Sequence, residues 1–403
     1  MTQALFGGYG FANPSTVNAS YNAVSSGGGW TAGALEYTRT QLVATPGTIS
    51  RLLVKLSSAP GLGKSYTITV RKNGVDTGLT CIISGAETIG SDIVNTIPVV
   101  AGDRLSLKQT PNGGPAATHI YWSTVFEPTM LGESLLLGVG AGDKLVDNYI
   151  RASGAYGIST ITETSTWQVL PVAGTIKSLF IRLSQSPGVL PDGYRFTLRV
   201  NGVSTSLTCT ITAPATTGSN TIDAIVVSAG DCIDIFVEPL NLPANNVTVQ
   251  MGLAFVPDGA HVVGLVLGSE RFGLSAIDTE YNALLTPNYN WSWGVTEAGF
   301  EILGQTCKLS GLYILLENAP GIGKSFTFTL RVNGVSVPLS VTISNMNTTG
   351  SDFGHQVSIS DNDFVTIMCV PSGNPAVGRD YWGCVISELI APSVTTLQAT
   401  EVT

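Results

Sequence analysis

The chain has 403 residues, of which 43% are hydrophobic and only 12% are charged. This hydrophobic share supports folded cores, and the length suits two to four domains. The net charge is −9, and the 19 Lys and Arg residues are scattered, so we expect none of the clustered basic surface that nucleic-acid binding requires. We also expect no membrane span, because no run of 18 apolar residues is present. No secretory signal is expected either, because the chain starts without the usual basic and apolar regions.

The first strongly patterned segment is predicted to be a β-hairpin. Residues 66–70 alternate apolar and polar side chains, which is typical of a strand with one buried face. Asn73 and Gly74 follow, and this pair favours a type I′ turn because both central positions need φ above zero. The return strand, residues 79–83, alternates in the same way. No long segment has the spacing of an amphipathic helix, so the predicted fold class is all-β.

The hairpin returns twice, which indicates an internal repeat. Asn73 is matched by Asn201 and then by Asn333, and the aspartates of a later turn keep the same offsets. Each copy carries eight or nine predicted strands, a number that favours a jelly roll over an immunoglobulin sandwich. We therefore predict three tandem homologous β-sandwiches that resemble jelly rolls, at residues 1–128, 129–257 and 258–390, followed by a C-terminal tail at residues 391–403.

Glycine-rich segments imitate nucleotide-binding loops. Residues 61–65 and 321–325 end like a P-loop, but Ser58 and Asn318 replace its first glycine and a strand follows in place of a helix. Residues 138–142 resemble a dinucleotide loop, yet no helix follows there either. We predict connecting loops in all three places and no bound nucleotide.

No residue set predicts a catalytic or metal centre. Cys81 and Cys209 occupy equivalent positions of the repeat, where the third copy has Val341, so we expect free, buried thiols as in a reducing compartment. The three histidines are not equivalent and lack neighbours at metal-ligand spacing. The Asp-containing turns carry too few carboxylates for a calcium cage. We therefore expect no enzyme activity, no metal and no cofactor.

Aromatic residues form the candidate interaction surface. Trp30, Trp291 and Trp293 fall in loop-like stretches, and Tyr121 and Tyr381 lie on the strand face opposite the predicted core. Such rings can pack against a protein partner or stack on the apolar face of a sugar, and both alternatives stay open at this point.

Two repeated stretches carry a resemblance to a known class of proteins. One runs from Ala59 to Val75 and returns from Ala319 to Val335, and the other is the Ala-Gly-Asp turn before Arg104 and Cys232. Together with the repeats as a whole, they resemble tandem β-sandwich proteins of tailed-phage virions, such as capsid decoration proteins, head fibres and tail-associated subunits.

The resemblance and the weakly charged surface imply a structural subunit. We predict a non-enzymatic virion or filament protein, assembled in the host cytoplasm, whose partners are copies of itself and other virion or filament proteins. A trimer is one candidate form of the homo-oligomer, because jelly rolls often pack around a threefold axis, and the β-prone tail is expected to add a strand to a neighbour. The alternative is a carbohydrate-binding adhesin, extracellular or at the cell surface, that recognises a glycan through the loop aromatics.

Overall fold

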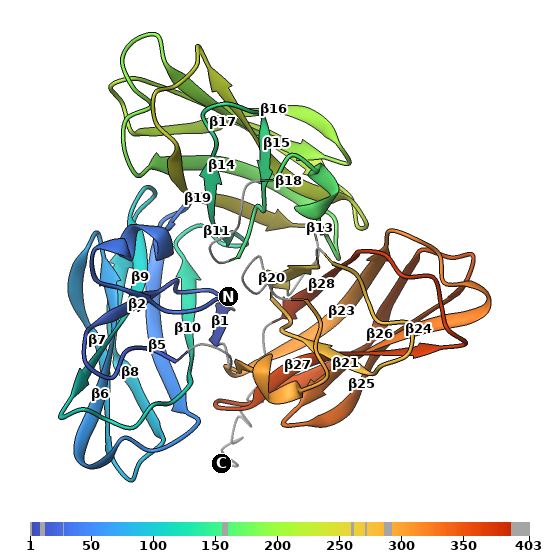
Figure 1. Ribbon diagram of the computed structural model, residues 1–403, viewed down its shortest axis with the longest axis horizontal. Coiled ribbons are helices and arrows are strands. Elements are labelled where there is room, and N and C mark those ends of the chain that lie inside the picture. The colour runs from blue at the N-terminus through green and yellow to red at the C-terminus, as the bar shows by residue number, and fades with distance from the viewer. Residues whose placement is uncertain are drawn as a thin grey trace, which may run out of the picture.

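The computed structural model describes residues 2–8, 13–26, 28–154, 160–258, 262–270, 272–285 and 292–387. Its strands form three β-sandwiches grouped around a common centre (Figure 1). This confirms the prediction of an all-β chain with three tandem sandwiches. The predicted tail lies outside the described residues. Within the described ranges, no helix is long and apolar enough to cross a membrane.

The elements of the three units have the following bounds. The first unit contains β1 (Gln3–Gly8), β2 (Ser20–Asn22), β3 (Thr31–Ala32), the 3-10 turn η1 (Gly33–Arg39), β4 (Gln41–Leu42), β5 (Gly47–Leu56), β6 (Gly61–Lys72), β7 (Val75–Gly85), β8 (Ile89–Val99), β9 (Arg104–Asn112) and β10 (Ile120–Pro128). The second contains β11 (Ser134–Gly142), β12 (Asn148–Ile150), η2 (Glu163–Ser165), β13 (Gln168–Val169), β14 (Gly174–Leu183), β15 (Gly193–Val200), β16 (Val203–Thr212), β17 (Thr217–Val227), β18 (Cys232–Leu240) and β19 (Val247–Pro257). The third contains β20 (Val262–Ser269), β21 (Glu280–Asn282), η3 (Glu297–Gly299), β22 (Ile302–Leu303), β23 (Cys307–Leu316), β24 (Gly321–Val332), β25 (Val335–Asn345), β26 (Thr349–Ile359), β27 (Phe364–Ser372) and β28 (Asp380–Ser387).

Each unit has the strand order of a jelly roll. In the first unit a β1-β10-β5-β8 sheet faces a β2-β9-β6-β7 sheet, and the other two units repeat this order with their own strands. Adjacent strands therefore often come from opposite halves of the unit, as the nested Greek keys of a jelly roll require. The short strands β4, β13 and β22 pair with β9, β18 and β27 beside the second sheet.

The repeated hairpin and its neighbouring turn form as predicted. Asn73 and Gly74 have φ values of 56° and 81°, and both residues of each equivalent pair in the other units also have positive φ. Asp103 holds the turn from the side: its Oδ1 accepts a hydrogen bond from Asn73 Nδ2 at 2.7 Å, and its Oδ2 accepts one from Val100 N at 2.9 Å. The equivalent aspartates accept the same two hydrogen bonds, so these carboxylates stabilise the turns.

The glycine-rich segments belong to strands. Residues 138–142 are the second half of β11, so our expectation of a flexible loop there was wrong. A Cβ atom on Gly138 would lie 2.9 Å from the backbone oxygen of Ala152, so glycine lets another backbone segment approach the strand closely. Gly61 and Gly321 are likewise the first residues of β6 and β24, where the strand pairing is irregular. The prediction of connecting loops at residues 61–65 and 321–325 was therefore also wrong, and no helix follows either segment.

The first strand of each unit lies at the centre of the ring, with both faces buried (Figure 1). Leu5 on β1 belongs to the core cluster of the first unit, whereas Ala4 and Phe6 belong to the cluster of the third. The exchange repeats around the ring: β11 supplies Leu135 and Leu137 to the first unit, and β20 supplies Leu265 and Leu267 to the second. The three cores are therefore interlocked in one direction.

Candidate interaction surface

Each unit joins the next through an equivalent contact, which we call a seam. The last long strand of one unit packs against the 3-10 turn and following short strand of its neighbour: β10 on β22, β19 on β4 and β28 on β13. Each contact is head-to-tail, because two different surfaces meet. Head-to-tail contacts generate a closed ring when the rotation between units allows closure. Here the ring closes within one chain (Figure 1).

Small residues on the last strands allow the seams to form. A Cβ atom on Gly252 would lie 2.1 Å from the backbone oxygen of Leu42, and one on Gly383 would lie 2.5 Å from that of Val169. The equivalent residue of the first unit is Ser123, whose Oγ donates to the backbone oxygen of Gly304 at 3.2 Å. The backbones of neighbouring units thus approach as closely as a glycine or a bonded serine permits.

The seams account for two of the predicted aromatic residues. Tyr121 is 2% exposed and packs edge-on against Phe364 of the third unit, with 4.8 Å between ring centroids. Tyr381 is 1% exposed, and its Oη donates to the backbone oxygen of Thr164 in the second unit at 2.8 Å. The expectation that both tyrosines are exposed was therefore wrong, because a neighbouring unit of the same chain covers the strand face opposite the core.

The loop tryptophans that are described cover the ends of the cores. Trp293 is 4% exposed, its ring packs against that of Trp382 at 5.5 Å, and its Nε1 donates to the carboxylate of Asp380 at 3.1 Å. Trp30 is partly buried and packs edge-on against Trp122 at 5.4 Å. Expecting an exposed contact surface at Trp293 was wrong, since the loop folds back over the sandwich. Trp291 lies outside the described residues.

Three ion pairs, which the sequence reasoning missed, hold the 3-10 turns in place. The arginine before each Asn-Gly turn lies on the outer face of its sheet and pairs with a glutamate of the 3-10 turn, at 2.6–2.8 Å. A tyrosine of the short second strand lies under each guanidinium group. The pairs are Arg71 with Glu36, Arg199 with Glu163 and Arg331 with Glu297. The signal was available, because the glutamate precedes the arginine by 34–36 residues in every copy.

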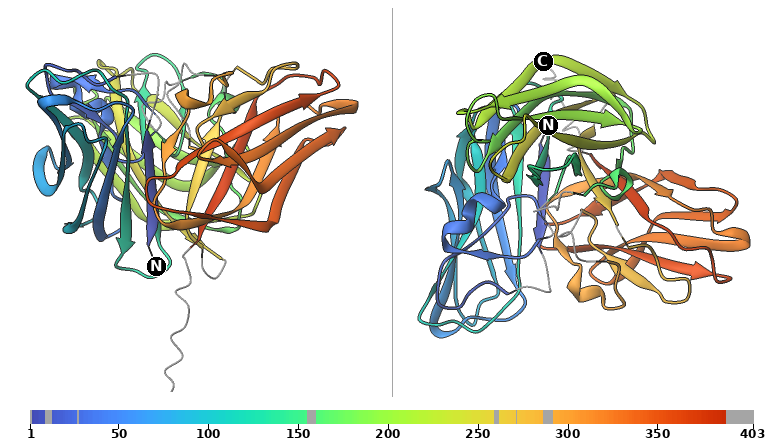
Figure 2. Two further views of the ribbon diagram at one scale, coloured as in Figure 1. Left: turned by 90° about the horizontal axis from the view of Figure 1, so that it is seen from below. Right: turned by 45° about the horizontal axis from the view of Figure 1, so that its top comes forward.

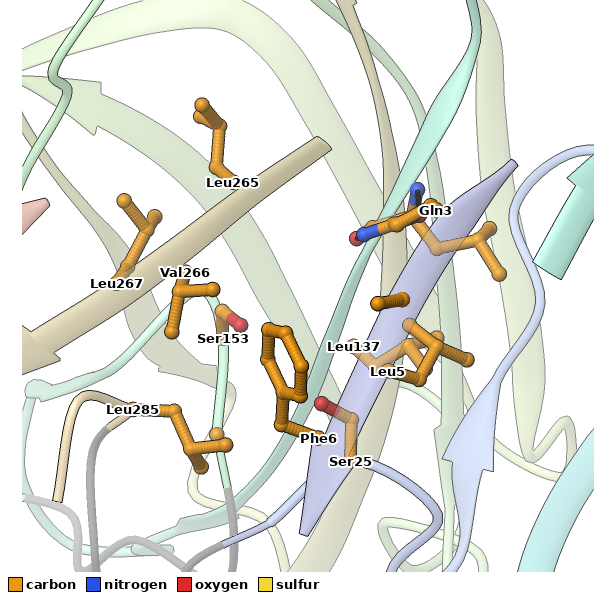
Figure 3. Close-up of a pocket in the computed structure, with 13 residues that line it drawn as sticks. Gln3, Leu5, Phe6, Ser25, Leu137, Ser153, Leu265, Val266, Leu267 and Leu285 are labelled. Carbon is orange, nitrogen blue, oxygen red and sulfur yellow. Dashed lines mark hydrogen bonds between the residues drawn. The ribbon is translucent and has the colours of Figure 1, made fainter. Parts of the chain in front are cut away.

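The central axis of the ring is closed. Figure 3 shows the first strands meeting there, with Leu5, Phe6, Leu137 and Leu265 among the labelled side chains around a cavity of about 20 Å³. This volume holds about one water molecule. The Gln3 side chain bridges two units, since its Nε2 donates to Leu135 O at 2.9 Å and its Oε1 accepts from Leu135 N at 2.7 Å.

Exposed apolar side chains recur at corresponding places of the three units. Figure 2 shows the three sandwiches side by side around the centre in two further views. Leu62 is 97% exposed and Ile322 is 83% exposed, at equivalent positions within the irregularly paired beginnings of β6 and β24. Val189 and Leu190 occupy the corresponding loop of the second unit and are also exposed. We call these four residues the apolar rim.

The part of the chain that the structure describes contains no cluster of three His, Cys, Asp or Glu side chains able to hold a metal ion. All six cysteines are free and buried, which confirms the prediction for Cys81 and Cys209. Burial raises the pKa of both thiols to about 12, so they are protonated at neutral pH.

Comparison with known proteins gives no match, either to a family model or to a curated sequence. A proposal for function therefore depends on the closed ring, the apolar rim and the cavities of this chain.

Proposed function

We propose that the chain is a non-enzymatic structural subunit that acts as a ready-made trimer in a virion or filament. The closed ring of three jelly rolls carries this proposal. Three separate jelly-roll chains would have to find each other in solution, whereas linked units meet at an effective concentration in the millimolar range. We expected three chains as one candidate form of the oligomer, and here three units of one chain surround a common axis. Association between whole chains is a further part of this proposal.

The surfaces left free by the ring suggest where assembly takes place. The side faces of the units are used in the seams, and the edge strands β8, β17 and β26 are interrupted by irregular pairing. In β8, Asp92 caps the irregularity by accepting hydrogen bonds from the backbone N–H groups of Val94 and Asn95. Bulged edges are poor templates for added strands. We propose the apolar rim for contacts with other subunits, because its side chains are exposed at equivalent places of all three units.

A matched pair of variants tests this proposal. We expect the wild-type chain to be a single-chain particle at nanomolar concentration and to form larger assemblies at micromolar concentration, by light scattering and electron microscopy. Changing Leu62 and Ile322 together to serine should abolish the larger assemblies. Val203→Ser is the control, because Val203 is also exposed but follows the Asn-Gly turn at the other end of its unit. A chain that stays a single particle at every concentration, with no virion or filament partner, would contradict the proposal.

The tail is tested separately. Deleting residues 391–403 should reduce assembly if the tail adds a strand to a neighbouring subunit, and unchanged assembly would assign all contacts to the ring. The adhesin alternative, which was based on the loop tryptophans, loses support at Trp293, which is buried, whereas Trp30 is partly buried and Trp291 lies outside the described residues.

A further inference from the structure

The three seams are built from equivalent residues, yet they differ in the hydrogen bonds that they make. Cavities lie at two of them: one of about 450 Å³ between the first and second units, and a larger one between the first and third. Tyr121, Gln250 and Tyr381 occupy the same position on the last strands. Gln250 Nε2 donates to the backbone oxygen of Tyr37 at 2.9 Å, and Tyr381 Oη donates to that of Thr164 at 2.8 Å. At the seam between the first and third units, Tyr121 Oη has no hydrogen-bond partner among the described residues, although the residue is 2% exposed.

Two features of the third unit explain this difference. Counted from the glutamate of each ion pair, Ala298 stands where the other units have Tyr37 and Thr164, so its side chain is the smallest of the three. On the same count, Glu301 replaces Trp167, whose ring packs against Tyr381 at 6.1 Å between centroids. The third unit therefore presents a carboxylate and free space where the second unit presents an indole ring.

The space is a cavity of about 480 Å³ at this seam. Its lining includes Lys55, Ser57, His119, Tyr121, Glu301 and Phe364. Cavities of roughly 300–1,000 Å³ are the usual size of small-molecule sites, and such sites often lie between domains. We call this cavity the seam pocket.

Several polar groups of the seam pocket lack protein partners. The Glu301 carboxylate makes no hydrogen bond to any described residue, and His119 Nδ1 is buried without a partner in the same part of the chain. Burial, with a smaller contribution from Glu297, raises the pKa of Glu301 to about 7, while Lys55 acts in the opposite direction. Burial also lowers the pKa of His119, so the ring is neutral near pH 7 and offers one donor and one acceptor.

We propose that the seam pocket binds a neutral saccharide unit. Sugar hydroxyls both donate and accept, so they can satisfy the Tyr121 hydroxyl, the Glu301 carboxylate and the His119 ring at once. A phosphate or other strong anion fits less well, because Lys55 is the one lysine or arginine of the lining and already contacts Asn362 O at 3.2 Å and the face of Phe364. A wholly apolar ligand would leave the polar groups buried and unpaired. The site does not depend on assembly of the chain.

Binding to the full chain can be measured with a panel of neutral hexoses and N-acetylhexosamines, by glycan array and by saturation-transfer NMR with titration. We expect one sugar of the panel to bind one site per chain. Tyr121→Phe should weaken binding by about tenfold because it removes the hydroxyl, and Glu301→Ala should do the same because it removes the carboxylate. Glu301→Trp copies Trp167 into the third unit and should abolish binding. Tyr381→Phe is the control, because it alters the equivalent residue of a closed seam.

The proposal is overturned if no sugar of the panel binds the folded chain at millimolar concentration, or if binding survives Glu301→Trp. It is also overturned if binding appears only after deletion of residues 391–403, since the tail would then be the natural occupant. Thermal unfolding of each variant confirms that it is folded. Assembly is measured independently, so failure of the saccharide site leaves the structural proposal intact.

Discussion

The closeness of the seam between the first and second units predicts that a single added methyl group will disturb it. In Gly252→Ala, the new Cβ atom would lie 2.1 Å from Leu42 O and 2.9 Å from Leu42 C, both of which are backbone atoms. A carbon atom needs more than 3 Å from such an oxygen, so the two units must separate by about 1 Å. Overpacking of this kind costs about 1–3 kcal/mol.

The seam should also loosen in a way that denaturation can measure. Gln250 lies two residues before the substitution on the same strand. A shift of this size therefore lengthens the hydrogen bond from Gln250 Nε2 to Tyr37 O. We expect Gly252→Ala to unfold at lower urea concentration than the wild type, by an amount that corresponds to 1–3 kcal/mol. Gly383→Ala should have a smaller effect, because its closest backbone contact is 2.5 Å from the new atom.

Gly78→Ala is the matched control. Gly78 also lies in a strand, and the nearest atom to an added Cβ there is 3.8 Å away. This variant should unfold within about 0.5 kcal/mol of the wild type. If Gly252→Ala unfolds at the same urea concentration as Gly78→Ala, the reasoning that the seam is a rigid, closely packed contact is refuted.

Three further predictions follow from the site chemistry. The six buried cysteines should resist thiol reagents at pH 8 in the native chain and react fully after denaturation, because burial keeps the thiol pKa of residues such as Cys81 near 12; fast native labelling would contradict this. Lys64→Ala and Lys324→Ala should change stability by no more than about 0.5 kcal/mol and affect no nucleotide binding, which calorimetry with ATP can check. The folded-state pKa of Glu301 is about 7 against an ordinary 4.5, so its contribution to stability falls as pH rises from 4.5 to 7, and Glu301→Gln should remove this fall from urea-unfolding profiles.

The features that could be predicted from the sequence are those that depend on residues close together in the chain. The hairpin at Asn73 and Gly74 was predictable because two residues with positive φ define the turn. The exchange of core residues around the ring was not, because it depends on contacts such as Gln3 with Leu135, which lie 132 residues apart. One signal was present: residues 135–137 and 265–267 are apolar without alternation, as expected for a strand buried on both faces.

The same limit explains the errors at the candidate site. Tyr121 was correctly placed on the strand face opposite the core, but alternation along one strand cannot show what covers that face. The seam pocket was also beyond sequence reasoning, because Glu301 and Tyr121 come from different units. Aligning the three copies around the glutamate of each ion pair would have shown Glu301 in the place of Trp167.

The one-way exchange of core residues has a consequence for synthesis on the ribosome. The core of the first unit is incomplete until β11 is synthesised and supplies Leu135 and Leu137. The core of the second unit is likewise incomplete until β20 is synthesised. The third exchange differs in its order. Ala4 and Phe6 are synthesised first, but the residues of the third unit that cover them are synthesised last. We expect β1 to keep an uncovered apolar face during most of translation, so nascent chains that stall within the third unit should be the most prone to aggregate.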